Sequence, residues 1–127
     1  MIHFDTNALI SLPIWAREDH PAIRCVLDGE PAAVCSVVWY EFLIGPINTD
    51  EIDLARAFIQ DRIVDVDQKD AALAATLFNT AGRKRKLKTD ALIAAAAIRA
   101  DARFVTVNKI DFDPFVGQGL RLLPVME

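Results

Sequence analysis

The sequence predicts an α/β fold: a central, mostly parallel sheet of four to five strands with helices on both of its faces. Two observations predict it. Short, nearly continuous apolar runs alternate along the chain with longer segments of helical spacing, and such runs are typical of parallel strands buried on both faces. Hydrophobic residues make up 53% of the chain, which is enough for one large core. A length of 127 residues leaves no room for a second domain with its own core. We therefore expect one domain over residues 1–127.

The first strand is expected at Met1–Phe4, a short apolar run at the start of the chain. Thr6 or Asn7 can cap the helix that follows, because both side chains accept hydrogen bonds from free backbone N–H groups. This helix runs through about Trp15 and should end or kink at Pro13, since proline lacks the N–H that continues a helix. The His20-Pro21 pair has the composition of a turn.

The second strand is expected at Ala32–Cys35, after a turn at Glu30-Pro31. Ser36 is a favourable cap for a helix over Val37–Ile44, and the Gly45-Pro46 pair would end that helix. The chain thus takes a second strand-to-helix step.

Two more helices and a strand are expected in the middle of the chain. The helix Glu51–Asp61 follows the capping segment Asn48-Thr49-Asp50, and the strand Ile63–Val66 comes next. Asp67 caps a long helix that ends near Gly82. Helical spacing predicts which residues of the two helices face inward: Ile52, Ala55, Phe58 and Ile59 in the first, and Ala71, Ala74, Ala75 and Phe78 in the second.

The last third of the chain contains one buried helix and two strands. Asp90–Ala100 is apolar nearly all round, which is typical of a helix buried on every side. Phe104–Val107 and Leu120–Leu123 have the composition of strands. Asp113, directly before Pro114, is interpreted as a turn residue.

Acidic or amide side chains stand at matching places along this pattern. Asp5 directly follows the first strand, and Asn108 and Asp111 follow the fourth. Glu41 and Asp90 lie on predicted helices among apolar neighbours. In open parallel sheets the functional site forms beyond the carboxyl ends of the strands. We therefore expect these side chains to meet in one crevice there.

Such a crevice needs positive charge. Carboxylates flanked by apolar residues are costly to bury unless a cation pairs with them, and Arg and Lys are scarce beside Asp5 and Glu41. The missing charge points to a divalent cation, and oxygen ligands without His or Cys suit Mg²⁺ or Mn²⁺ rather than Zn²⁺. Metal-dependent phosphodiester chemistry is the reaction class that this arrangement favours.

Each acid also has an ordinary structural interpretation. Asp5 could be a helix cap, Glu41 an exposed helix residue, and Asp90 a first-turn acid that complements the helix dipole. Thr6 and Thr106, each beside one of the motif acids, could hydrogen-bond a metal-bound water or a substrate phosphate, or could be local backbone caps.

Four segments, in their sequences and in their order along the chain, resemble those of the PIN-domain ribonucleases, in particular the toxin half of VapBC-type toxin–antitoxin modules. The resemblance covers the chain from Met1 to about Pro124. It rests on an apolar strand ending in Asp-Thr-Asn at Asp5, a Glu-Phe-Leu-Ile-Gly segment at Glu41, a Thr-Asp-Ala-Leu-Ile-Ala-Ala helix at Asp90, and a Val-Thr-Val-Asn-Lys-Ile-Asp-Phe segment through Asn108 and Asp111.

The resemblance implies a PIN-like three-layer sandwich and an Mg²⁺-dependent endoribonuclease in which Mn²⁺ can substitute. Asp5, Glu41 and Asp90 match the three acids of the family. The fourth acid stands at the position of either Asn108 or Asp111 in PIN domains, and here the former is an amide. Asn108 can still bind a metal weakly or hold a water, so it stays a catalytic candidate beside Asp111, toward which the role of second-metal ligand shifts. Asp5, Glu41, Asp90 and Asp111 are accordingly the expected metal ligands.

Basic residues cluster just before one of these acids. Net charge is −4 and the isoelectric point is about 5.1, which argues against wholesale electrostatic binding of nucleic acid. The run Arg83–Lys86, together with Lys88, nevertheless precedes Asp90 directly. Arg85, Lys86 and Lys88 are therefore candidate substrate-binding residues, although a run of this kind is also typical of a solvated helix end.

The expected partners follow from the resemblance: an RNA substrate, a small VapB-like antitoxin, and a second copy of the chain in a homodimer. Trp15, Trp39 and Phe42 are candidates for an apolar groove that takes an antitoxin segment. Two other classes were weighed. A non-catalytic RNA-binding or scaffold module would be expected to lack the acids, and a phosphoacceptor signalling domain would need an adjacent acidic pair where Asp5 is followed by Thr6.

Location is predicted from what the sequence lacks. The longest apolar run, Ala91–Ile98, is far shorter than the roughly 18–20 residues of a membrane span, and the first residues do not form a secretory signal. Cys25 and Cys35 match no metal-ligand spacing and are expected to be reduced thiols. We therefore expect a cytoplasmic protein.

Overall fold

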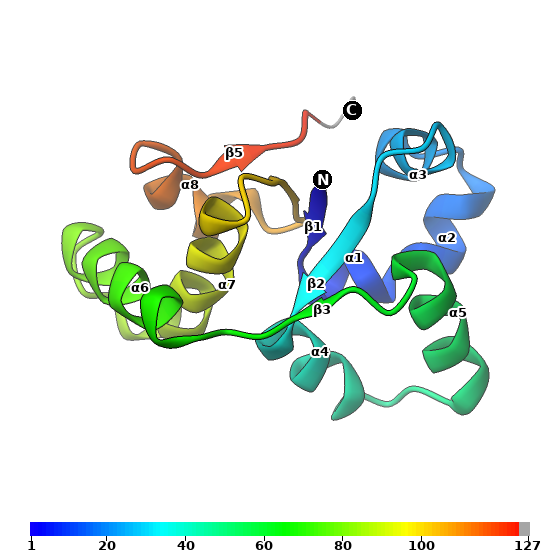
Figure 1. The fold of residues 1–127 in the computed structure, drawn as a ribbon, viewed down its shortest axis with the longest axis horizontal. Coiled ribbons are helices and arrows are strands. Elements are labelled where there is room, and N and C mark those ends of the chain that lie inside the picture. The colour runs from blue at the N-terminus through cyan, green and yellow to red at the C-terminus, as the bar shows by residue number, and fades with distance from the viewer. Residues whose placement is uncertain (125–127) are drawn as a thin grey trace.

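The centre of the fold is a five-stranded, fully parallel sheet in the order β3-β2-β1-β4-β5 (Figure 1). The computed structural model describes residues 1–124. The strands are β1 (Ile2–Phe4), β2 (Ala32–Cys35), β3 (Ile63–Val64), β4 (Arg103–Val105) and β5 (Arg121–Leu122). All residues of β1 and β2 are buried, as expected for central strands covered on both faces. The predicted α/β class is confirmed.

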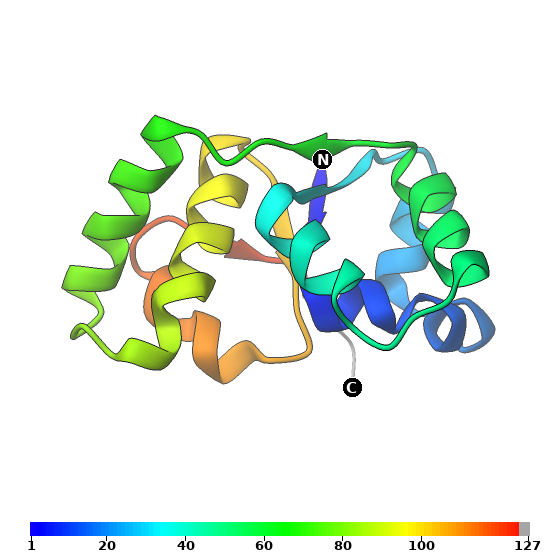
Figure 2. The ribbon, with the colours of Figure 1, turned by 90° about the horizontal axis from the view of Figure 1, so that it is seen from below.

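Helices cover both faces of this sheet, which makes three layers (Figures 1 and 2). On one side lie α6, α7 and α8, and on the other lie α1, α2, α3 and α5, while α4 follows β2 at the lower end of the sheet in Figure 1. The helices of residues 1–124 are α1 (Thr6–Ile10), α2 (Leu12–Arg17), α3 (Pro21–Leu27), α4 (Ser36–Leu43), α5 (Thr49–Ile59), α6 (Gln68–Thr80), α7 (Lys88–Arg99) and α8 (Lys109–Val116), with a 3-10 turn η1 (Arg85–Leu87) before α7.

The core joins these layers through aromatic and small side chains. Phe4 of β1 meets Phe58 of α5 edge to face, with ring centroids 5.3 Å apart. On the other side Phe104 of β4 packs on Phe112 of α8 at 4.7 Å. Residues 94–97 of α7 are four buried alanines, and their small side chains let this helix lie close to the sheet.

Two helix starts have the reciprocal hydrogen bonds of a capping box, which explains why these segments begin where they do. At α5, Asn48 Oδ1 accepts from Glu51 N (2.9 Å) and Glu51 Oε1 accepts from Asn48 N (3.1 Å). At α6, Asp67 and Asp70 exchange the same pair of bonds, at 2.9 and 3.0 Å. The cap predicted at Asp67 is confirmed.

Helix α3 was missed because its start signal is unusual. The sequence indicated only a turn at His20-Pro21, whereas His20 is the N-cap of α3 and Pro21 is its first residue. The His20 Nδ1 atom accepts a hydrogen bond from Ala22 N (3.1 Å), and its ring stacks on Trp15 with centroids 3.8 Å apart. Proline suits the first helical position because its missing N–H would have no partner there.

Helix α8 is the second correction. Asp113 and Pro114 lie inside this helix rather than in a turn. Burial of Phe112 and Phe115 stabilises the segment despite the proline, and Gln118 Nε2 donates to the Pro114 carbonyl (3.3 Å). Local composition could not reveal this, because the stabilising contacts come from the core.

Three smaller expectations were also wrong. Ser36 is the first residue of α4 rather than its cap, and its Oγ accepts from Val66 N (3.1 Å). The first helix divides at Ser11, before the predicted break at Pro13. In α6, Ala71 and Ala75 are exposed while Ala74 and Leu77 face the core, because the helix is rotated so that Asp70 is buried against Arg99.

Across the described residues no helix has both the length and the apolar character that crossing a bilayer requires. Both cysteines are free thiols, Cys35 buried and Cys25 half-buried, as expected.

Candidate active site

Asp5 stands where β1 ends and α1 begins, and both of its carboxylate oxygens are held. Oδ1 accepts from Thr6 N (2.8 Å), so Asp5 is also the N-cap of α1. Oδ2 accepts from Thr106 Oγ1 (2.8 Å), which lies just past β4. Burial raises the pKa of Asp5 above its ordinary value, against the lowering effect of these two hydrogen bonds. Capping leaves lone pairs free on both oxygens, so it does not exclude a further role for Asp5.

Glu41 of α4 is tied to the same place through Thr6. The Thr6 Oγ1 atom donates to Glu41 Oε1 at 2.6 Å, while the Thr6 backbone N donates to Asp5. One threonine therefore positions two carboxylates that are 36 residues apart in sequence and come from different elements.

Residues after β4 form the third side of the site. Thr106 Oγ1, which donates to Asp5, accepts from the backbone N of Asn108 (2.9 Å). The Asn108 side chain then donates to Asp111 Oδ2 (2.6 Å), and Lys86 Nζ lies 3.4 Å from Asp111 Oδ1. A continuous chain of hydrogen bonds thus runs from Glu41 through Thr6, Asp5, Thr106 and Asn108 to Asp111.

Asp90, in the first turn of α7, is the carboxylate most affected by the others. Its pKa is raised to about 7, first by burial and then by the negative charges of Asp5, Asp111 and Glu41, with Lys86 acting in the opposite direction. Asp5, Asp111 and Glu41 therefore each lie within electrostatic reach of Asp90. We call Asp5, Glu41, Asp90 and Asp111 the acidic pocket.

The acidic pocket has the donor set of a magnesium or manganese site rather than a finished coordination sphere. Within residues 1–124, no three His, Cys, Asp or Glu side chains stand close enough together to hold one ion between them. Mg²⁺ keeps several of its waters and needs only one or two protein carboxylates, so such a grouping is not required. The pocket offers only oxygen ligands and an excess of negative charge, which is the chemistry such an ion fits.

Comparison with known proteins agrees with the geometry. Residues 2–113 match the PIN domain family. The chain belongs to this family. The resemblance noted in the four sequence motifs is thus confirmed. No curated protein sequence matches this PIN domain significantly.

Solved structures similar to this PIN domain include a chain of a toxin–antitoxin complex and chains of VapBC complexes. A chain of a toxin–antitoxin complex from Klebsiella pneumoniae is 26% identical, with a TM-score of 0.67 over 88% of this chain and 90% of that one. A chain of DNA-bound VapBC from Salmonella typhimurium is 20% identical (TM-score 0.69, 96% of both chains). A chain of VapBC2 from Rickettsia felis, bound to a promoter DNA fragment, is 21% identical (TM-score 0.66, 97% and 98%). The last two likenesses establish the fold.

The structure of the PIN domain brings together most of the residues singled out from sequence. Asp5, Glu41, Asp90, Asn108 and Asp111 converge through the hydrogen bonds and charge interactions above. Thr6 and Thr106, whose roles the sequence left open, both donate to carboxylates of the pocket. Of the basic candidates, Lys86 pairs with Asp111, while Arg85 and Lys88 are exposed.

The predicted apolar groove was misplaced on this PIN domain. Trp15, Trp39 and Phe42 belong to the core, with exposed fractions of 8%, 8% and 2%. A shallow hollow lies between α1, α2, α4 and α5, where exposed apolar side chains gather, and of the three predicted residues it is lined by Phe42 but not by Trp15 or Trp39. Its lining residues are Leu9, Ile10, Leu12, Pro13, Phe42, Glu51, Leu54 and Ala55. Large aromatic residues on a helix suit core and partner surface equally, so their sequence pattern could not distinguish the two.

Proposed function

We propose that this PIN domain is a metal-dependent endoribonuclease that acts as the toxin of a type II toxin–antitoxin module. The observation that carries the proposal is the acidic pocket, in which burial and then three neighbouring carboxylates raise the pKa of Asp90 to about 7. A partly buried group of like charges is costly to a folded protein and is typical of a site built to hold a cation. Similarity to chains of toxin–antitoxin complexes supports the biological role.

Asp5, Glu41, Asp90 and Asp111 are the proposed ligands of Mg²⁺, for which Mn²⁺ can substitute. When bound, the ion supplies an acidified water and neutralises charge on the phosphate. The chain's own part is to hold its carboxylates in fixed directions. Thr6 and Thr106 hold Glu41 and Asp5 by hydrogen bonds, and Asn108 holds Asp111 in the same way, so the amide serves as a positioning residue.

The RNA backbone is proposed to reach the pocket along η1, where the basic residues lie. Lys86 already faces the acids through its ion pair with Asp111, and Arg85 and Lys88 stand exposed beside it. Local positive charge at this rim offsets the net charge of −4 for an anionic substrate.

Cleavage of a synthetic RNA, with Mg²⁺ and with EDTA, tests the proposal. Wild type should cut only with metal, and Asp5→Asn should reduce the rate by at least about a hundredfold while the circular dichroism spectrum stays unchanged. Asp53→Asn is the matched control, because it makes the same change at an exposed position of α5. Metal-independent cutting, or equal cutting by Asp5→Asn and wild type, would show that the acidic pocket is not the active site.

The proposed antitoxin contact is the hollow beside α1. Ile10, Ile14 and Leu54 are 42%, 50% and 47% exposed, an apolar surface that a partner segment could cover. A basic side chain from the same segment, such as arginine, would pair with the acidic pocket by bidentate hydrogen bonds and block it. A homodimer and a cytoplasmic location complete the proposal.

Expression in cells tests the toxin role separately from the chemistry. The wild-type chain should arrest growth, and the Asp5→Asn variant should not. Wild type should copurify with a small protein from its native host. Ile10→Asp should keep nuclease activity but no longer copurify with that protein, because a buried aspartate in the interface has no partner. Growth that is undisturbed by active, soluble wild-type protein would exclude the toxin role.

A further inference from the structure

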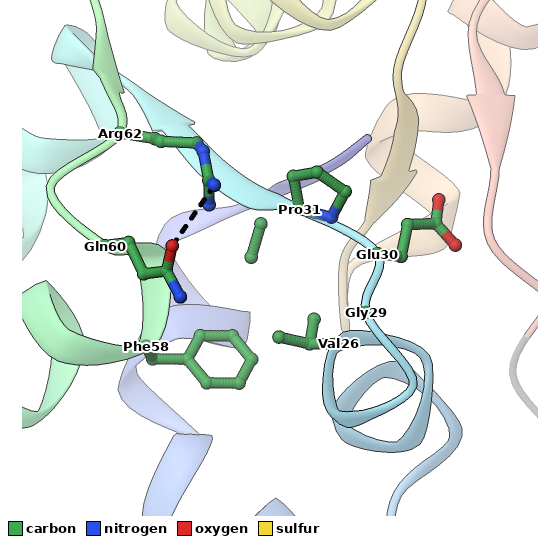
Figure 3. A pocket seen from close by; sticks show the side chains of 8 residues that line it. Val26, Gly29, Glu30, Pro31, Phe58, Gln60 and Arg62 are labelled. Atoms are coloured by element: carbon green, nitrogen blue, oxygen red, sulfur yellow. Dashed lines mark hydrogen bonds between the residues drawn. The ribbon is translucent and has the colours of Figure 1, made fainter.

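Figure 3 shows a second pocket, which lies at the other end of the strands from the acidic pocket. It is formed where α3 leads into β2 and where α5 leads into β3, so it borders the amino ends of these strands. The acidic pocket, in contrast, lies beyond their carboxyl ends. The cavity has a volume of about 140 Å³ and is lined by Val26, Gly29, Glu30, Pro31, Ala32, Phe58, Gln60 and Arg62.

The walls of this pocket are apolar on one side and polar on the other. Figure 3 shows the Phe58 ring and Val26 at the lower side, Pro31 at the upper right, and Arg62 with Gln60 at the left. The Arg62 Nη2 atom donates to Gln60 Oε1 (3.2 Å), and Nη1 donates to the Ile59 carbonyl (3.5 Å). These two bonds hold the guanidinium at the pocket and leave other N–H groups for an occupant.

Arg62 carries the only uncompensated charge among the lining residues. No carboxylate of residues 1–124 lies within ion-pair distance of it. Glu30 is neutralised by Arg103 and by the chain's amino terminus (3.5 Å), and in Figure 3 its side chain points away from the pocket. The neighbouring Asp61 pairs with Arg56 at 2.9 Å. A half-buried guanidinium in an otherwise neutral hollow favours an anion.

We propose that this pocket binds a small organic monocarboxylate with an apolar body, such as an aromatic or branched-chain acid. Arg62 takes the carboxylate through charge-assisted hydrogen bonds, and the Gln60 amide provides a further donor. Phe58 and Val26 pack against the apolar body. The inference does not depend on the proposed nuclease activity, because the two pockets share no residue.

The size of the cavity limits the ligand. A cavity of about 150 Å³ accommodates benzene, so about 140 Å³ has room for one ring or a short branched chain. A ligand of about nine heavy atoms, at about 0.3–0.5 kcal/mol per atom, binds with a Kd of roughly 1–10 mM. Benzoate is therefore the probe, and neutral benzamide is its matched control.

The test is a titration of the 127-residue chain with each probe. Binding is monitored by the chemical shifts of backbone amides and by the melting temperature. Benzoate should shift amides around Phe58, Gln60 and Arg62 in a saturable way and raise the melting temperature, since it binds only the folded state. Benzamide should bind at least about tenfold more weakly, because it cannot pair with the guanidinium.

Variants make the assignment specific. Arg62→Gln should weaken benzoate binding at least about tenfold. Arg17→Gln, the same loss of charge at an exposed residue of α2 outside the pocket, should leave it unchanged. Val26→Phe fills the cavity and should abolish binding even if Arg62→Gln fails to fold.

Three results would overturn the proposal. The first is no saturable benzoate binding up to about 50 mM, which lies above the expected Kd, and the second is equal benzoate binding by Arg62→Gln and wild type. The third is binding of an acetylated peptide that ends in valine without binding of benzoate. The last would assign the pocket to the end of a partner chain instead of a free acid.

Discussion

His3 is buried in the central strand without a hydrogen-bond partner for its Nε2 atom, and we expect its replacement by leucine to change how stability depends on pH. Its exposed fraction is 2%, and burial, reinforced by the positive amino terminus, lowers its pKa from 6.5 to about 4. The folded state therefore favours neutral His3, while the unfolded chain takes up a proton below about pH 6.5. The contribution of neutral His3 to the free energy of unfolding is therefore complete above about pH 6.5 and is lost as the pH falls to about 4.

The size of the effect follows from the two pKa values. At about 1.4 kcal/mol for each pH unit, the full loss is about 3 kcal/mol, of which about 2 kcal/mol is lost between about pH 8 and about pH 5. His3→Leu removes the titrating group and the unpaired polar atom together, so it should also be neutral or stabilising at about pH 8.

Urea unfolding of wild type and His3→Leu at several pH values measures this difference. Subtracting one curve from the other cancels every other titrating group. His20→Asn is the comparison variant: it removes the other histidine but keeps an N-cap on α3. Burial also lowers the pKa of His20, but this ring is only half-buried, so His20→Asn should reduce acid destabilisation less than His3→Leu does. Parallel stability curves for wild type and His3→Leu would refute the reasoning.

Three further predictions concern the acidic pocket. Asp90→Asn should stabilise the metal-free protein at about pH 8 by roughly 1–2 kcal/mol once solvent screening is allowed for, because the pKa of Asp90 is raised and its neutral form is favoured on folding. This gain should vanish below about pH 4, and equal stability of the two proteins in urea at about pH 8 would contradict the prediction. Thr106→Val should cost about 1–3 kcal/mol in urea unfolding by leaving a buried Asp5 oxygen unpaired, whereas Thr106→Ser should keep most of the stability; a loss of the same size in both variants would point to packing instead. Millimolar Mg²⁺ should raise the melting temperature of wild type by mass action but not that of the Asp5→Asn and Asp90→Asn double variant, and calorimetry that shows the same rise in both would place the ion elsewhere.

The sheet could be predicted because its signal is local. Apolar runs such as Ala32–Cys35 are buried on both faces, so their burial appears directly in their composition. Helices α3 and α8 could not be predicted, because each depends on contacts that composition does not show. His20 acts through a ring nitrogen and a stacked Trp15, and Pro114 is tolerated because Phe112 and Phe115 enter the core.

The acidic pocket was predictable only in outline. Asp5 follows from the rule that sites form beyond strand ends, but the meeting of Glu41 and Asp90 was expected chiefly from the family motifs. The hydrogen bonds of the two threonines could not be predicted from the sequence, because Thr6 bonds to a residue 35 positions away and Thr106 to one 101 positions away. Distances of that kind are set by the packing of α4 and β4 around β1, which no local pattern encodes.

The order of the strands has a consequence for synthesis of the protein. β1 precedes the other four strands in the chain, yet it is the middle strand, and β4 pairs with it only after residue 105 has been added. Asp5 and Glu41 lie ahead of β3 in the chain, whereas Asp90, Thr106 and Asp111 follow it. Because long-range parallel pairing is slow to form, the central strand lacks its second neighbour until β4 has been synthesised. A polypeptide that stops before residue 111 therefore cannot assemble all four carboxylates of the acidic pocket.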